Sequence, residues 1–230
     1  MLEAIANAVR LLATFDPELF RIIWLSLFVS GSAVVLAALC GVPLGTWLGL
    51  KPVPSVRVIT IIIYTLMGLP PVVAGLVIYM LLSRRGMLGP LNLLFTVEAM
   101  IIVQTLLAIP IIVGLTAIAV RSKGREIRDT VLVLGADHRL LVWTLIREAR
   151  YGILGAVITG FGRVIAEVGA VMMVGGNIEG HTRVLTTAIV LETRKGNFAL
   201  AMALGIILLL LALLINSGLY RLQAGGTDGT

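Results

Sequence analysis

Five long apolar runs, separated by shorter polar segments, set the pattern of this 230-residue chain. They cover residues 22–50, 58–83, 99–120, 151–174 and 196–220. A membrane-spanning α-helix needs about 20 mainly apolar residues to cross about 30 Å of hydrocarbon, and each run is long enough. The pattern therefore predicts an all-α integral membrane protein with about five transmembrane helices, forming a single domain over residues 1–230.

The composition favours the same class and predicts the two ends of the chain. Apolar residues make up 59% of the sequence, charged residues only 13%, and the mean hydropathy is +1.07. Ordinary soluble domains have about 45–50% apolar and about 25% charged residues. Apolar residues recur at helical spacing within residues 1–20, which predicts an amphipathic helix lying on the membrane. Residues 222–230 are glycine-rich and are expected to form a flexible tail.

Small residues recur every four positions in the first run, at Gly41, Gly45 and Gly49. This spacing places them on one face of a helix, where they allow another helix to approach closely. The partner helix is expected either within the same subunit or in a second copy of the chain.

Two adjacent prolines, Pro70 and Pro71, interrupt the second run. They remove two backbone donors from a membrane helix and predict a kink. Irregular backbone at membrane depth is tolerated where neighbouring helices or a water-filled cavity satisfy it. Two interpretations stay open: the prolines line the gate of a transport pathway, or they form a purely structural kink.

The fourth run is the one that contains charged residues, Arg163 and Glu167. Residues four apart share one face of a helix and pair. A charge at membrane depth costs about 2.5–3.5 kcal/mol on insertion scales, so neither side chain is expected to face lipid. The pair either shapes the route of an anion or joins this span to a neighbouring helix.

Residues 121–150 form a polar, basic segment between the third and fourth runs. It holds seven of the 18 lysines and arginines, at positions 121, 123, 125, 128, 139, 147 and 150. Such a concentration predicts a cytoplasmic loop, and alternation then places the N-terminus outside and the C-terminus inside. The polar segment 175–195 is then extracytoplasmic.

The remaining chemistry excludes several classes of function. The net charge of +6 and the pI of about 10.1 fit attraction to anionic lipid rather than nucleic acid. No glycine-rich phosphate loop is present, and the two histidines lie in separate segments. We therefore expect no catalytic residues, no metal site and no cofactor.

A helix–glycine–helix pattern lies inside the basic segment. Asp129, Thr130 and Val131 precede Gly135 at the spacing found in the cytoplasmic loop of ABC-importer permeases, and Ala136 and Asp137 follow it. The segment resembles that loop, which suggests Asp129, Gly135, Ala136 and Asp137 as contacts for an ATPase. Arg147 and Glu148 replace the Leu-Pro that ends the family's pattern.

Further blocks resemble the permeases of molybdate and tungstate importers. They lie at residues 68–75, 84–90, 160–169, 175–188 and 191–198, and the resemblance is closest to the tungstate branch. It extends over roughly residues 20–222. The order and spacing of the blocks carry this signal more than any single block does.

The resemblance implies a type I ABC importer permease that moves a tetrahedral oxyanion: tungstate first, then molybdate or sulfate. Its expected partners are two ATP-binding subunits, an extracytoplasmic oxyanion-binding protein, a second permease copy and the lipid bilayer. The chain itself is then not an enzyme. A secondary carrier, a channel or a membrane enzyme not coupled to an ATPase are the alternatives, although the sequence lacks the His/Asp/Glu clusters that an enzyme requires.

Overall fold

The computed structural model describes residues 17–133 and 138–224, and the described residues are helical with connecting turns. Three helices are long and apolar enough to cross a membrane alone. These are α2 (Pro17–Leu50), the Val97–Lys123 part of α5 (Val97–Val133), and the Phe198–Gly218 part of α10 (Phe198–Ala224). They match the first, third and fifth predicted runs. α2 begins at Pro17, where proline lacks only an N–H that the first turn does not use.

The second and fourth runs are broken helices, which corrects the prediction of two continuous spans. α3 (Val53–Met67) and α4 (Pro71–Leu82) meet at a bend of 97°. α7 (Arg150–Ile165) and α8 (Gly169–Gly175) meet at a bend of 61°. Counting each bent pair as one span gives five spans among the described residues, as the apolar pattern predicts.

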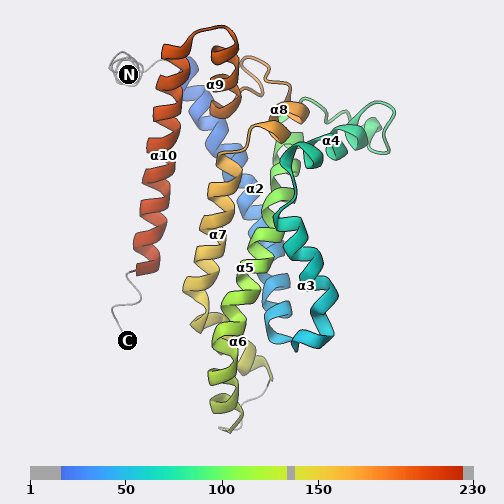
Figure 1. Cartoon of the computed structure of the whole chain (residues 1–230), viewed down its shortest axis with the longest axis vertical. Helices are drawn as coiled ribbons and strands as arrows, with labels where there is room; N and C mark the ends of the chain where they lie inside the picture. Colours follow the sequence, from blue (N-terminus) through green and yellow to red (C-terminus); the bar gives the residue numbers. More distant parts are fainter. Residues whose placement is uncertain (1–16, 134–137, 225–230) are drawn as a thin grey trace.

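Three short helices connect these elements. A turn of 3₁₀ helix, η1 (Gly89–Leu91), lies between α4 and α5. α6 (His138–Glu148) precedes α7, and α9 (Leu185–Arg194) precedes α10. The helix α9 lies at the upper end of the bundle and α6 at the lower end (Figure 1), so we call these the α9 end and the α6 end.

The centre of the bundle is the packing of α2 against α5. A methyl group added at Gly45 would lie 2.6 Å from the carbonyl oxygen of Val113, and one at Gly49 would lie 2.8 Å from the Cβ of Val120. Every larger residue would therefore push the two helices apart. Of the two partners left open by the sequence, the structure places the glycine face of α2 against α5 of the same chain.

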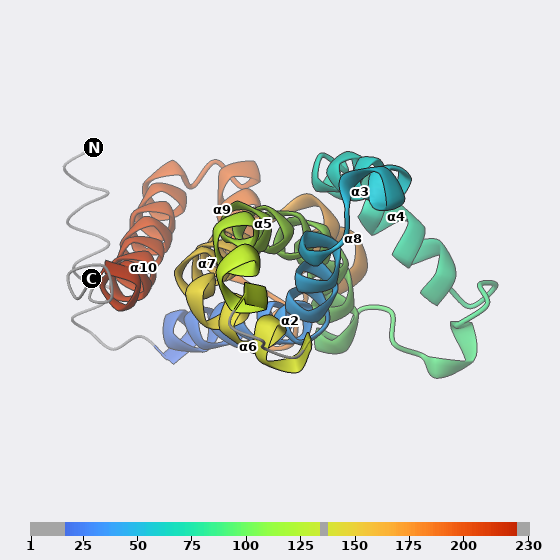
Figure 2. The same cartoon turned by 90° about the horizontal axis from the view of Figure 1, so that it is seen from below.

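The outer helices surround this centre and expose apolar surface. α10 lies on one side and the bent pair α3–α4 extends from the other (Figure 2). Large side chains of these helices are more than half exposed, among them Val58, Val72, Leu209 and Leu214. A soluble monomer does not expose apolar surface on this scale, whereas a membrane protein presents it to lipid or to another subunit.

Candidate functional site

The first break lies between α3 and α4. The backbone at Pro70 is extended, and Pro71 is the first residue of α4. Neither proline donates a backbone hydrogen bond, but the carbonyl oxygen of Pro70 accepts N–H groups from Val73 and Ala74 at 3.0 and 3.2 Å. The two prolines thus end one half-helix and start the next at a sharply different angle, a larger change of direction than a kink in a continuous helix.

The second break is organised by Glu167. Its Oε2 atom lies 3.1 Å from Nη1 of Arg163, and its Oε1 accepts the backbone N–H of Ala170 at 3.2 Å. The expectation that both residues share one helix face is wrong in detail, because α7 ends at Ile165 and Glu167 lies beyond it. The carboxylate reaches back to α7 and forward to the first turn of α8. It therefore ties the two halves of the broken span to each other.

The burial of this pair is unequal. The Glu167 side chain is 5% exposed, whereas the Arg163 side chain is 35% exposed. A buried carboxylate requires a charged partner and hydrogen bonds, and Arg163 and Ala170 supply these to Glu167. The arginine keeps part of its guanidinium group at the surface of the chain.

Two further side chains, not singled out from the sequence, hold the second break. Gln104 of α5 donates from Nε2 to the carbonyl oxygen of Val164 at 3.1 Å. Thr186 of α9 donates from Oγ1 to the carbonyl oxygen of Glu167 at 2.9 Å. Side chains of other helices thus satisfy backbone oxygens that a continuous helix would satisfy itself. A lone amide within the apolar run 99–120 is the sequence signal that could have indicated Gln104.

The two breaks lie next to each other because α4 packs directly on α8. A methyl group added at Gly75 would lie 2.7 Å from the Cα atom of Ala170. One added at Gly169 would lie 2.9 Å from a methyl group of Val72. The structure therefore places the two breaks close to each other, because the first turns of α4 and α8, which follow Pro70–Pro71 and Glu167, are in contact.

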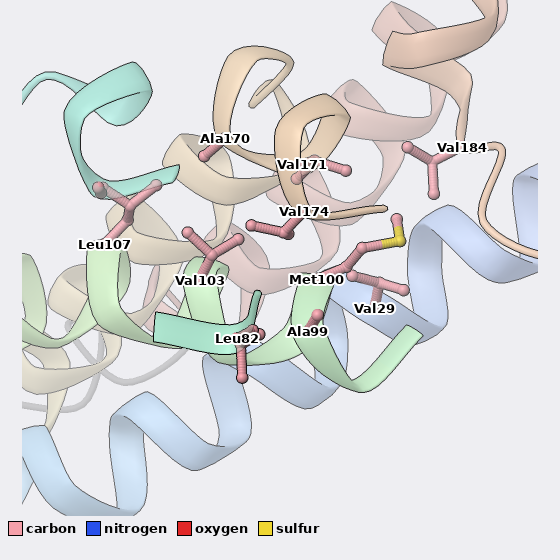
Figure 3. Close-up of a cluster of buried hydrophobic side chains, with 11 residues drawn as sticks. Val29, Leu82, Ala99, Met100, Val103, Leu107, Ala170, Val171, Val174 and Val184 are labelled. Carbon is pink, nitrogen blue, oxygen red and sulfur yellow. The ribbon is translucent and has the colours of Figure 1, made fainter. Parts of the chain in front are cut away.

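An apolar cluster packs around the contact between α4 and α8 (Figure 3). Ala170, Val171 and Val174 of α8 lie among side chains of α2, α4 and α5. Met100 and Val103 of α5 are fully buried in this cluster. Both half-helices after the breaks are therefore seated on the central helix α5 rather than standing alone.

At the α6 end, α5 continues ten residues beyond its apolar part, from Lys123 to Val133. Asp129 lies on this extension, and α6 begins at His138. Gly135, Ala136 and Asp137 lie outside the described residues. Two helices thus flank the position where the sequence predicts a turn for an ATPase contact.

Arg121 fixes the base of this extension. Its Nη2 atom donates to the carbonyl oxygen of Leu48 at 3.0 Å. Leu48 lies in the last turn of α2, which has no basic residue of its own. A cation at the carbonyl end of a helix is favoured by the helix dipole, so Arg121 joins the end of α2 to the start of the extension.

The α9 end carries a mixed set of charges. Arg183 lies 3.3 Å from a carboxylate oxygen of Glu18 and 3.3 Å from one of Glu179, which links the start of α2 to the segment before α9. Lys195 lies 2.8 Å from Glu192, and the hydrogen bond from this lysine lowers the pKa of the Glu192 carboxyl. Among the described residues at this end, acidic and basic groups lie side by side and do not form a uniformly positive surface for an anion.

Among the described residues, no three His, Cys, Asp or Glu side chains gather as metal ligands would. The arrangement instead defines a class: a multi-pass membrane protein with three to five spans, in which two bent helix pairs pack against each other. Irregular backbone within apolar segments, satisfied by side chains of neighbouring helices, is typical of transport proteins.

Comparison with known proteins gives the family. Residues 41–225 match the family of binding-protein-dependent transport system inner membrane components, so the chain belongs to this family of ABC permeases. The chain is 43% identical over 221 residues to the tungstate uptake system permease protein of Peptoclostridium acidaminophilum, covering 96% of this chain and 97% of that protein.

Two other relatives show the range of the family. A probable anion ABC transporter permease protein of Haloferax volcanii is 45% identical over 211 residues, covering 89% of this chain and 91% of the relative. The molybdenum transport system permease protein of Mycobacterium tuberculosis is 28% identical over 211 residues, covering 89% of this chain and 80% of the relative. Proteins of this family are permease subunits rather than enzymes, and the resemblance stated from the sequence blocks is confirmed.

Proposed function

We propose that this chain is the membrane subunit of an ATP-driven importer that carries a tetrahedral oxyanion into the cytoplasm. The observation that carries the proposal is the 43% identity to a tungstate permease over nearly the whole of both chains. Tungstate is therefore the first candidate, and molybdate and sulfate are the next. More distant relatives are permeases for molybdenum and sulfate.

The importer has four kinds of partner in this proposal. Two ATP-binding subunits dock on the 121–150 loops, with Asp129, Gly135, Ala136 and Asp137 at the contact. An extracytoplasmic binding protein delivers the anion to the α9 end. A second permease copy completes the pathway, and the lipid bilayer surrounds both copies. The exposed apolar face of α3–α4 is suited to contact the second permease copy and the surrounding lipid.

The breaks at Pro70–Pro71 and Glu167 form the gate in this proposal. Movement of the α5 extension reaches the end of α7 through the hydrogen bond from Gln104 to Val164, and α8 is joined to α4 through the Gly75–Ala170 contact. Because half-helices separated by a break turn independently, a small displacement at the α6 end changes the angle between α4 and α8. A rigid, continuous span would not allow that change.

We expect the α6 end to face the cytoplasm. Single cysteines at positions 86 and 181 should react with a membrane-impermeant thiol reagent added outside the cell, and cysteines at 123 and 138 should react only after the membrane is opened. The background for all four is the chain with Cys40 replaced by serine, since Cys40 is exposed at the surface of α2. Labelling at 123 from outside would reverse the proposed orientation.

Coupling to the ATPase is tested at Gly135. The apolar run that ends there predicts a turn, and in a left-handed conformation any side chain costs about 1–2 kcal/mol. We expect Gly135→Val to leave membrane insertion intact, to lower co-purification of the ATPase, and to separate ATP hydrolysis from anion uptake. Gly218→Val, at a position on α10 with open space around it, is the matched control. Full docking and coupling in the Gly135→Val protein would remove the loop from the coupling role.

A further inference from the structure

One face of α6 is exposed and carries aromatic and basic side chains. Trp143 is 61% exposed and Leu140 is 52% exposed, and Arg147 follows Trp143 one turn later on the same face. The opposite face packs into the bundle through Leu141 and Leu145, which are 6% and 1% exposed. α6 therefore has an inner side packed against its own chain and an outer side that is largely exposed.

Two arginines, Arg147 in the last turn of α6 and Arg150 at the start of α7, lie against aromatic rings. The guanidinium carbon of Arg147 is 5.5 Å from the centre of the Trp143 ring. That of Arg150 is 4.7 Å from the centre of the Tyr151 ring, and its Nη2 donates to the Tyr151 hydroxyl at 2.7 Å. Contacts of this kind hold a flexible arginine in one region while its remaining N–H groups stay exposed.

The position of this face along the bundle matches the membrane boundary. The apolar part of α5 ends at Lys123, and α7, which starts the fourth span, begins at Arg150. α6 lies between these two points, beside the lower part of α5 (Figure 1). Tryptophan and tyrosine concentrate at this depth in membrane proteins, with arginine beside them.

We propose that this face, the α6 lipid face (Leu140, Trp143, Arg147, Arg150 and Tyr151), binds the headgroup of an anionic phospholipid. The planar guanidinium groups donate paired hydrogen bonds to the phosphate, and the rings lie at the level of the glycerol backbone. Glu148 is the single acidic residue between positions 140 and 151, so the face is net positive. In the orientation proposed above, the lipid belongs to the cytoplasmic leaflet.

This site lies in the 121–150 loop but away from the residues assigned to the ATPase contact. Those residues lie at positions 129–137, before α6, whereas Arg147 lies in the last turn of α6 and Arg150 is the first residue of α7. An 11-residue helix is about 16 Å long. The two ends of α6 thus face different partners: a protein at the start and a lipid headgroup at the end. Binding of the lipid depends neither on the direction of transport nor on the presence of the ATPase.

The test measures lipid bound to the full-length permease in detergent. Phosphatidylglycerol or phosphatidylcholine is added, and native mass spectrometry counts the lipid molecules retained. We expect Arg147→Gln/Arg150→Gln to weaken phosphatidylglycerol binding by about tenfold, since two basic residues at an anionic surface are removed. The matched control, Arg84→Gln/Arg85→Gln, removes two exposed arginines at the α9 end and should change binding less than twofold.

A second variant separates the effect of the site from that of net charge. Arg147→Lys/Arg150→Lys keeps both charges but loses the planar groups, and it should recover part of the binding. The proposal would be overturned if Arg147→Gln/Arg150→Gln and Arg84→Gln/Arg85→Gln lost phosphatidylglycerol binding equally, or if Arg147→Gln/Arg150→Gln lost none. The proposal would also be overturned if the Arg147→Gln/Arg150→Gln protein still bound lipid but no longer co-purified with the ATPase, because the face would then be a protein contact.

A fluorescence measurement places the lipid at Trp143. With Trp24 and Trp47 changed to phenylalanine, Trp143 is the one tryptophan left. Phosphatidylglycerol with brominated chains should quench its emission at lower mole fraction than brominated phosphatidylcholine does. Equal quenching by the two lipids would contradict selection of an anionic headgroup.

Discussion

Replacing Arg163 by alanine is expected to destabilise the permease more than replacing Arg163 and Glu167 together. The single change leaves the Glu167 carboxylate, 5% exposed, with the N–H of Ala170 as the one donor left of the two that the structure assigns to it. The double change removes the buried charge as well. Breaking a buried ion pair from one side costs about 3–5 kcal/mol. Arg163 is 35% exposed, so we expect the single change to cost about 2–3 kcal/mol.

The measurement is the thermal unfolding temperature of the purified permease, together with oxyanion uptake in liposomes. Glu167→Gln serves as the control, because its amide oxygen still accepts the N–H of Ala170 while the charge is lost. A double variant that is well folded but no more active than Arg163→Ala would show that the arginine acts on the anion itself and not only on the break. A double variant less stable than the single one would contradict the pairing account.

The second large effect is expected at Gly75, where α4 meets α8. A Cβ atom there would lie 2.7 Å from a backbone atom, the Cα of Ala170, so the helices have to separate. Overpacking of this kind costs about 1–3 kcal/mol, and valine adds further bulk. We expect Gly75→Val to lower anion uptake by at least about tenfold, since a cost of about 1.4 kcal/mol on the gating step of transport corresponds to a factor of ten in rate.

Two comparisons make this prediction specific. Gly31→Val, on α2 with open space around the added group, should retain uptake close to that of the unchanged protein. Adding Ala170→Gly to Gly75→Ala should restore only part of the uptake lost in Gly75→Ala, because it removes the Ala170 Cβ at 3.3 Å and leaves the Cα at 2.7 Å. Uptake at the unchanged rate in Gly75→Val would show that the α4–α8 contact is not part of the gate.

The sequence predicted the approximate limits of the long apolar segments because apolar length is a local property of the chain, and its five runs fall within the three to five candidate spans of the structure. It also marked one of the two breaks, since adjacent prolines cannot continue a helix. The break in the fourth span had no such signal. It falls at residues 166–168, where no proline occurs. It depends on hydrogen bonds from Gln104 and Thr186, which lie 60 and 19 positions away in the chain from the carbonyl groups that they bind.

The candidate site was predictable to a similar degree. Helical spacing indicated that Arg163 and Glu167 pair, but not that the glutamate lies beyond the helix end and bonds to α8. The partner of the glycine face on α2 stayed open because small residues show that a helix approaches without showing which one. The meeting of the two breaks rests on contacts between Val72, Gly75, Gly169 and Ala170, and no local pattern joins segments so far apart.

The central claim, that this chain forms the path of an ATP-driven oxyanion importer, is tested most directly by transport in liposomes. The permease, the ATPase and the binding protein are reconstituted together, and uptake of tungstate is measured with ATP inside or outside the vesicles. The account predicts that uptake requires all three proteins and ATP on the side of the 121–150 loop. It also predicts that sulfate competes only as far as the binding protein accepts it. Uptake by the permease alone, without ATPase or nucleotide, would contradict it and indicate a carrier or channel.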